Sequence, residues 1–299
     1  MNSYQGQPNK NYFVQTLAQQ NTVDVWSLQR LTFEPKGWLL NLRNDIRTAV
    51  GSLKRGPNDV LHTTYSSSSN DFCDIENILL YNVGMGHFSR LATRGIRFER
   101  SFIHPPPPQP LPAQQLHHHH YTSANANRGF LHWRVGQTLA QWTNIELPEL
   151  TSAMKIEPIW YAIWLGPMQI LHMPTQELKR FGVSVTIITP SGKTINIASL
   201  TKPLIDGLVA AFHVHDGQNV KQISQRIGDR LGVNPDTIER LLSRKERAIL
   251  GRRQLVWLRS SGVQWNPADH YCLAAEVLAD SHRSSQWLIS GTLFEIEPL

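Results

Sequence analysis

The stretch FCDIENILLYNVG, residues 72–84, places two acidic residues at the start of an apolar helical stripe. A second stretch, TKPLIDGLVAAFHVHDG at residues 201–217, has a similar pattern. The apolar residues of both follow the i, i+3, i+4, i+7 spacing that places side chains on one face of a helix. A strand-like segment precedes each stretch, PNDVLHTTY at 57–65 and FGVSVTIITP at 181–190. We therefore expect two units in which a strand is followed by a helix.

A further strand-like segment follows each helix. ATRGIRFERS (92–101) and RSSGVQWNPA (259–268) both contain Gly, a β-branched residue, a polar residue and an aromatic residue in that order. In the second unit we also expect KTINIASL (193–200) to form a hairpin with the preceding strand, and the helix to begin at Pro203. These patterns predict an α+β protein with two similar strand–helix–strand halves. An internal duplication explains the likeness, and chance similarity between two ordinary units is the alternative.

Composition suggests where the halves begin and end. Residues 1–20 are rich in Gln and Asn and are expected to form a flexible arm. Residues 104–128 hold six of the 18 prolines and the tract His117–His120, and consecutive prolines favour an extended backbone. We therefore expect a Pro/His-rich linker or loop between an N-terminal α+β half (21–103) and a C-terminal α+β half (129–299). Four adjacent histidines do not converge readily on one ion, so no metal site is predicted there.

The cysteine content and the hydropathy pattern predict the cellular compartment. The two cysteines, Cys73 and Cys272, form no disulfide framework, and we expect them to be unpaired. The chain shows no signal-peptide pattern and no apolar run long enough to cross a bilayer. A cytoplasmic protein without a membrane partner is therefore expected.

The positive charge of the chain is concentrated in residues 221–259. This segment holds ten basic and four acidic residues, whereas the rest of the chain holds equal numbers of each. A local excess is typical of a surface that contacts phosphates, although a solvated helix or an interface with an acidic protein has the same composition. We predict that nucleic acid, most simply DNA, contacts the following side chains of this segment: Lys221, Arg226, Arg240, Arg244, Lys245, Arg247, Arg252 and Arg253.

The same region contains a predicted basic helical insertion at 218–253. Within it, QISQRIGDRLGVNPDTIERLLSR (222–244) resembles the helix-turn-helix of many DNA-binding proteins. Gly232 suits a turn with positive φ, and Asn234 suits the N-cap of a second helix. The acidic residue Asp236 at the start of that helix argues against reading of bases, so contacts to the phosphate backbone are expected. A purely structural helical hairpin is the alternative.

The acidic residues allow a catalytic interpretation. DIEN (74–77) resembles the Asp-x-Asp-Asn signature of the RusA-type Holliday-junction resolvases, with Glu76 in place of the second Asp. TKPLIDGLVAAFH (201–213) is similar to the context of that signature, although Leu204 and Gly207 replace its first Asp and its Asn. The resemblance implies a Mg²⁺-dependent nuclease that cuts branched DNA as a dimer. The implied catalytic residues are Asp74, Glu76, Lys202 and Asp206, and the implied metal ligands are Asp74, Glu76 and Asp206.

Acidic residues at a helix N-terminus also have a role without chemistry, because they accept hydrogen bonds from free N–H groups and oppose the helix dipole. The sequence therefore favours a non-catalytic protein without a cofactor, which binds nucleic acid or serves a nucleic-acid-handling complex. A Mg²⁺-dependent resolvase-type endonuclease and a scaffold that docks an acidic protein are the alternatives. Whether Asp74 and Glu76 meet Asp206 in one cleft distinguishes capping from catalysis.

Overall fold

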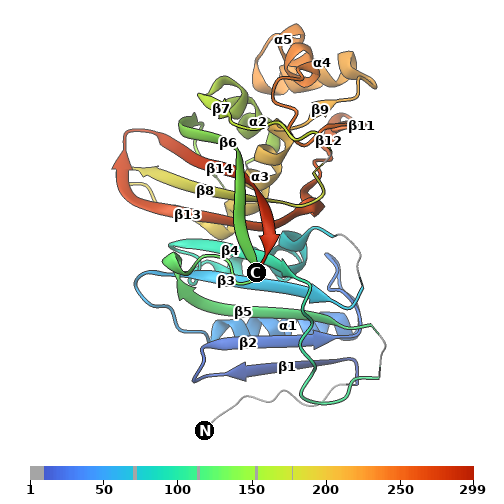
Figure 1. Ribbon diagram of the computed structural model, residues 1–299, viewed down its shortest axis with the longest axis vertical. Helices are drawn as coiled ribbons and strands as arrows, with labels where there is room; N and C mark the ends of the chain where they lie inside the picture. Colours follow the sequence, from blue (N-terminus) through green and yellow to red (C-terminus); the bar gives the residue numbers. More distant parts are fainter. Residues whose placement is uncertain (1–9, 70–72, 113–114, 152–153, 177) are drawn as a thin grey trace.

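The structure is a computed structural model that describes residues 10–69, 73–112, 115–151, 154–176 and 178–299. A mixed sheet of ten strands runs through both halves (Figure 1). From its edge inwards, the first half contributes β1 (Tyr12–Leu17), β2 (Thr22–Ser27), β5 (His117–Asn125), β3 (Asp59–Ser67) and β4 (Gly95–Ser101). From the centre outwards, the second half contributes β13 (Cys272–Ser284), β8 (Phe181–Pro190), β14 (Trp287–Pro298), β6 (Trp133–Leu147) and β7 (Met168–Ile170).

The two halves meet at the central pair of strands, β4 and β13. These strands are antiparallel, with Phe98 opposite Ala275. On each side the next strand is parallel to the central one, since β3 is parallel to β4 and β8 to β13. All strands farther out pair antiparallel with their neighbours. The order of pairing directions is therefore the same on both sides of the central pair.

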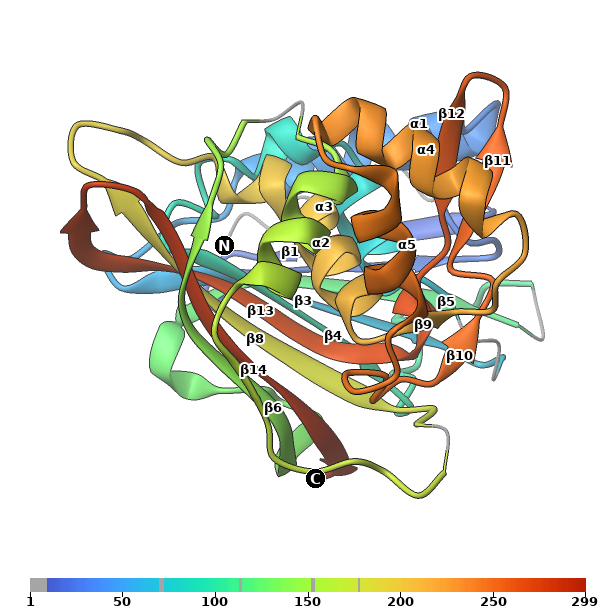
Figure 2. The ribbon, with the colours of Figure 1, turned by 90° about the horizontal axis from the view of Figure 1, so that it is seen from above.

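Helices lie on one face of this sheet (Figure 2). In the first half, α1 (Trp38–Gly51) buries Leu42, Ile46 and Val50, whose spacing places them on one helical face. In the second half, α2 (Ile156–Leu165) and α3 (Ile197–Ala211) occupy this layer. The first half also has a short helical segment, which comprises η1 (Asn77–Tyr81), with π-helical hydrogen bonding, and η2 (Met85–Phe88).

The insertion predicted in the second half forms two helices, α4 (Val220–Leu231) and α5 (Pro235–Ser243), at the end of the molecule far from β1 (Figure 1). Gly232 has φ 67° in the turn, and the Asn234 side chain accepts a hydrogen bond from the N–H of Asp236, as expected for an N-cap. The helices approach closely, since a Cβ on Gly228 would lie 2.6 Å from the backbone oxygen of Val233. Four short strands lie at or just beyond the ends of the insertion: β9 (Val214–His215), β10 (Arg252–Arg253), β11 (Val256–Arg259) and β12 (Gly262–Trp265).

Two expected strands of the second half are wrong. Residues 193–200 form no hairpin strand, because α3 begins at Ile197, capped by the Asn196 side chain, and Pro203 lies inside the helix. Alternating apolar residues there resembled a strand, but Ile197, Leu200 and Leu204 also fit one helical face. Residues 259–268 contain the last residue of β11 and the strand β12, and these two strands pair with each other outside the large sheet. The sheet strand that follows the insertion is β13, whose residues from Cys272 to Ala275 are buried.

The expected linker and arm are also partly incorporated in the sheet. Residues 117–125 form β5, because the histidine side chains alternate between its two faces and find partners there. His118 and His120 both contact Oδ1 of Asp24 on β2, at 3.0 and 2.8 Å, and His117 contacts the hydroxyl of Tyr65 on β3 at 2.7 Å. Residues 12–17 of the expected arm form β1, and residues 1–9 lie outside the described part of the chain.

Candidate functional site

Two carboxylates of the first half lie at the start of the short helical segment. Oδ1 of Asp74 accepts a hydrogen bond from the backbone N–H of Asn77 at 3.1 Å, which is a helix-capping contact. Its other oxygen, Oδ2, lies 3.1 Å from Nζ of Lys202 in the second half. Glu76 follows in the first turn and is 4% exposed. Capping thus explains one oxygen of Asp74, whereas the other accepts from the side-chain amide of Asn77 and also contacts Lys202 of the second half.

Helix α3 supplies the central cation of this centre. Nζ of Lys202 lies 3.2 Å from Oδ2 of Asp206 and 3.4 Å from Oε2 of Glu76. Lys202 and Asp206 are four positions apart, so their side chains share one face of α3. The structure therefore brings together Asp74, Glu76, Lys202 and Asp206, the complete set implied by the sequence resemblance.

A further carboxylate, Asp269, was missed in the sequence. It begins η4 (Asp269–Tyr271), directly before β13, and its Oδ2 lies 4.0 Å from Nζ of Lys202. Burial alone would raise the pKa of Asp269, but hydrogen bonding to His270 and the charge of Lys202 outweigh it and lower that pKa. The available signal was an acid just before the apolar run that begins at Cys272, but the expected strand at 259–268 ended one residue too early to include it. Asp71, another acid near the first motif, lies outside the described residues.

The four carboxylates share one ammonium in a largely buried setting. Burial raises the pKa of Asp206 to about 7, and it raises the pKa of Glu76 well above its ordinary value. The pKa of Asp74 is raised as well, mainly by burial, with the negative charge of Asp269 adding to the effect. Burial alone would lower the pKa of Lys202, but the surrounding carboxylates outweigh it and raise that pKa. The centre therefore carries more acidic groups than its single cation neutralises.

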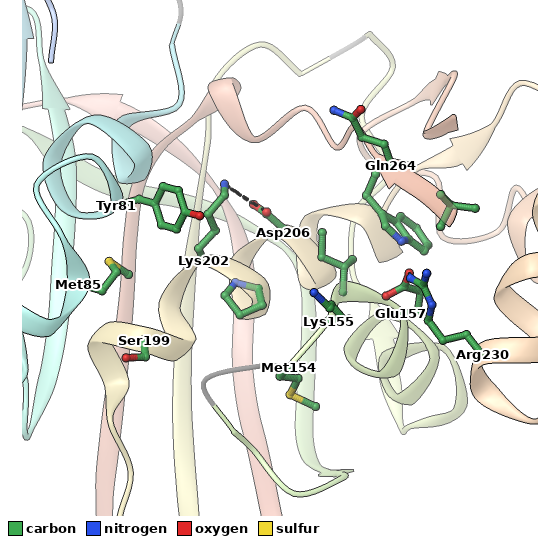
Figure 3. A pocket seen from close by; sticks show the side chains of 14 residues that line it. Tyr81, Met85, Met154, Lys155, Glu157, Ser199, Lys202, Asp206, Arg230 and Gln264 are labelled. Carbon is green, nitrogen blue, oxygen red and sulfur yellow. Dashed lines mark hydrogen bonds and ion pairs between the residues drawn. The ribbon is translucent and has the colours of Figure 1, made fainter. Parts of the chain in front are cut away.

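Lys202 and Asp206 of this centre line a cleft of about 520 Å³, whose other lining residues come from both halves of the chain. Figure 3 shows Tyr81 and Met85 of the first half on one side, with Lys202 and Asp206 of α3 beside them. The opposite side is lined by Lys155, Glu157, Arg230 and Gln264 (Figure 3). The side chain of Lys202 is 24% exposed, so solvent reaches the carboxylates through this cleft.

Some buried polar atoms around the cleft lack a partner. Within the described residues, Oε1 of Glu76, Oδ1 of Asn77 and Nε1 of Trp265 have no hydrogen-bond partner. Glu76 is more than nine-tenths buried, and its other oxygen already contacts Lys202. A buried oxygen of this kind is costly unless a cation or a donor satisfies it.

The predicted nucleic-acid-binding residues fall into two groups. Several are held by intramolecular contacts and serve to build the insertion. Arg226 donates to the backbone oxygens of Ser260 and Gly262 at 2.8 and 2.6 Å. Arg247 donates to the backbone oxygen of Ile163 at 2.9 Å, and Arg252 donates to that of Asp216. Arg253 likewise has interactions within the chain.

The remaining predicted residues face solvent. Lys221 and Lys245 are exposed. A groove of about 830 Å³ at the end of α5 is lined by Arg240, Arg244 and Lys245, together with Thr237, Leu241, Ser243 and Glu246. Arg244 lies over the ring of Trp164 and 3.5 Å from Glu246, so its charge is partly shared. The groove is therefore a hollowed and exposed part of the predicted basic surface.

No preformed metal site or membrane helix is found in the described part of the chain. No group of three or more His, Cys, Asp or Glu side chains among these residues is arranged to hold a metal ion. No helix there has the length and apolar character needed to cross a bilayer. The described cysteines, Cys73 and Cys272, are both free and buried.

Comparisons with protein-family models, curated proteins and solved structures gave no significant match.

Proposed function

We propose that this protein cleaves phosphodiester bonds in nucleic acid, with a divalent cation such as Mg²⁺ held by the carboxylates around Lys202. The observation that carries the proposal is the convergence of Asp74 and Glu76 with Asp206 and Asp269 around Lys202, which together with Asp206 lines the cleft. These residues come from both halves of the chain, and capping of separate helices would not require them to meet.

The chemistry of the residues fits such an ion. Carboxylate oxygens are ligands that Mg²⁺ prefers, and four of these groups face a single ammonium. The pKa values of Glu76 and Asp206 are raised mainly by burial, and the nearby carboxylates add to the effect. The partnerless oxygen of Glu76 is a further acceptor for a cation. We therefore propose Asp74, Glu76, Asp206 and Asp269 as its ligands.

The ammonium of Lys202 lies among the four carboxylates and balances part of their negative charge. We propose that this is why the carboxylates do not form an open metal site. A divalent ion held by these carboxylates would supply positive charge at this point, and the Lys202 ammonium would then be able to contact a phosphate in the cleft. Bound divalent ions stabilise an attacking and a leaving oxygen in phosphodiester cleavage. Lys155, exposed on the opposite side of the cleft, adds positive charge that attracts the phosphate backbone.

The sequence resemblance to RusA-type resolvases supports the same chemistry, because the motif residues of both halves lie in this centre. We also propose that the halves arose by internal duplication. The matching order of parallel and antiparallel strands on the two sides of β4 and β13 supports this origin. A duplicated chain supplies within one molecule the two halves that a dimer would bring together.

The test is a cleavage assay with purified protein on branched and duplex DNA, with Mg²⁺ or Mn²⁺ and with a chelator. We expect cleavage that depends on the ion and is lost in Asp206→Asn while DNA binding persists, because the carboxylate holds the ion and not the DNA. Asp229→Asn, at an exposed acid of α4, is the matched control and should cut as the parent does. Ion-independent cutting, or equal cutting by Asp206→Asn, contradicts the proposal.

A second candidate function is non-catalytic binding of nucleic acid by the insertion. The groove lined by Arg240, Arg244 and Lys245 favours it. Contacts with phosphates would weaken with salt, and removing them would weaken binding to all sequences alike. Arg244→Glu combined with Lys245→Glu should therefore abolish retention on DNA at moderate salt. If these changes leave DNA binding intact but abolish capture of an acidic protein, the groove serves a scaffold function instead.

A further inference from the structure

Two aromatic side chains are stacked in solvent beside the carboxylate centre. The rings of Phe33 and Tyr81 lie 5.2 Å apart between centroids and are inclined by 11°. Phe33 is 57% exposed and Tyr81 is 41% exposed, so each ring keeps a large part of its surface in water. Single exposed apolar residues are common on proteins, but two rings stacked on each other at the surface form a flat apolar platform.

The platform reaches the cleft through Tyr81. Tyr81 is the last residue of η1, the segment whose start carries Asp74 and Glu76. Its side chain lines the cleft together with Met85, Lys202 and Asp206 (Figure 3). A group that stacks on these rings is therefore held beside the groups proposed to act on a phosphodiester.

The position of Phe33 is fixed by its surroundings. It lies in the connection between β2 and α1, where the neighbouring side chain of Leu31 is completely buried. The side-chain amide of Asn82 donates to the backbone oxygen of Leu31 at 2.8 Å, which ties this connection to the end of η1. The same bond holds Phe33 close to Tyr81, so the platform exists before any ligand arrives.

We propose that the Phe33–Tyr81 platform stacks an unpaired nucleobase, so that the preferred substrate is nucleic acid with single-stranded nucleotides beside the cut phosphate. Every base presents a flat π face, and stacking on aromatic side chains is tolerant of sequence. Bases inside an intact duplex have both faces covered by neighbours, and only unpaired bases reach such a surface. Lys155, exposed in the same cleft, provides positive charge for an adjoining phosphate. This inference rests on the proposed function and specifies its substrate.

The test measures binding without cutting. Fluorescence anisotropy in the presence of a chelator compares a labelled single strand, a duplex of equal length, and a duplex with an unpaired flap. We expect Tyr81→Ala and Phe33→Ala to weaken binding of the single strand and the flap by about 5- to 100-fold, the range for loss of one stacked base. Tyr81→Phe keeps the ring and should bind as the parent does. Phe102→Ala removes an aromatic residue of similar exposure, 43%, in another part of the surface and is the control.

A second readout does not depend on the fold of a variant. With the parent protein, 2-aminopurine in the unpaired flap should lose fluorescence on binding, whereas the same base within the duplex should not. Unchanged fluorescence, or equal single-strand affinity in the parent and in both alanine variants, overturns the platform. Platform-dependent binding without ion-dependent cutting overturns the proposed cleavage and leaves the platform in place.

Discussion

Lys202 Nζ lies 3.1 Å from Asp74 Oδ2, although the two residues are 128 positions apart. Lys202 belongs to α3 of the second half and Asp74 to the start of the short helical segment of the first. Their contact joins two sequence motifs that are each incomplete alone. The predictions below follow from the resulting centre, from the insertion and from the groove on its surface.

Lys202→Met should destabilise the protein in a pH-dependent way. Removing one partner of a buried ion pair leaves uncompensated charge and costs about 3–5 kcal/mol. The loss of stability in Lys202→Met should be large at pH 8, where the carboxylates are ionised. It should be smaller at pH 5, where bound protons neutralise the carboxylates in place of the ammonium. Melting temperatures at the two pH values measure the difference. Lys193→Met, which breaks the exposed pair with Glu149, is the control and should cost about 0–1 kcal/mol at either pH. An equal loss for Lys202→Met at both pH values would contradict the account.

The stability of the parent should fall as pH rises from about 4 to about 7. Burial raises the pKa of Asp206 from 3.8 to about 7, so in this window the native chain keeps a proton that the unfolded chain has released. The unfolded state then binds fewer protons, and the free energy of unfolding decreases with pH until Asp206 is ionised in both states. Urea unfolding at pH 5 and pH 8 measures the slope. Asp206→Asn, which cannot ionise, should flatten it, and an unchanged slope would show that Asp206 is not the group responsible.

Divalent ions should stabilise the parent most at high pH. An ion that binds only the native chain adds about 2.7 kcal/mol of stability at a concentration 100 times its dissociation constant. Protons compete for the same oxygens, so Mg²⁺ or Mn²⁺ should raise the melting temperature more at pH 8 than at pH 5. In Asp269→Asn the rise should be smaller because one proposed ligand is lost. A rise of the same size in the parent and in this variant would exclude Asp269 from the ion site.

Much of the fold could be predicted from the sequence, and the errors have physical causes. The helical hairpin of the insertion was predictable because Gly232 and Asn234 have strong local preferences at a turn and an N-cap. The segment at 193–200 was assigned to a strand because short apolar patterns fit both periods, and only the sheet decides between them. The histidines of β5 gave no strand signal, because their stability there depends on Asp24 and Tyr65 from neighbouring strands.

The candidate site was predictable in its parts and not in its assembly. The resemblance identified Asp74, Glu76, Lys202 and Asp206, but the sequence could not show that the halves meet at β4 and β13. That pairing places the start of β13 beside the end of β4, and it brings Asp269 next to Asp74. A contact between distant segments depends on the register of the sheet, which local patterns do not encode.

Gly228→Ala should loosen the insertion. Its Cβ would lie 2.6 Å from the backbone oxygen of Val233, closer than the packed helices allow, and overpacking of this kind costs about 1–3 kcal/mol. Amide hydrogen exchange should show faster exchange in α4 and α5, with little change in the large sheet. Gly51→Ala, where a Cβ would meet nothing within 4 Å, is the control. Unchanged exchange in the insertion would contradict the close approach of its helices.

The basic residues of the insertion should separate into structural and ligand-contacting groups. Arg226→Gln removes donors to Ser260 and Gly262 and should lower the melting temperature. Lys245→Gln, at an exposed residue of the groove, should leave the melting temperature unchanged and reduce the salt dependence of DNA binding by about one unit of slope. The opposite result would be a lower melting temperature in Lys245→Gln and a smaller salt dependence of DNA binding in Arg226→Gln. That result would show that the exposed groove is not the nucleic-acid surface.

The most direct test of the shared centre is the single-turnover rate of Mg²⁺-dependent DNA cleavage in Asp74→Asn, Asp206→Asn and the double variant. If both halves build one ion site, each single change should lower the rate at least about 100-fold, and the double variant should lose little more, because residues that act as a unit are not additive. Parent-like cleavage by Asp74→Asn, or a parent that does not cut DNA with Mg²⁺ or Mn²⁺, would contradict the account.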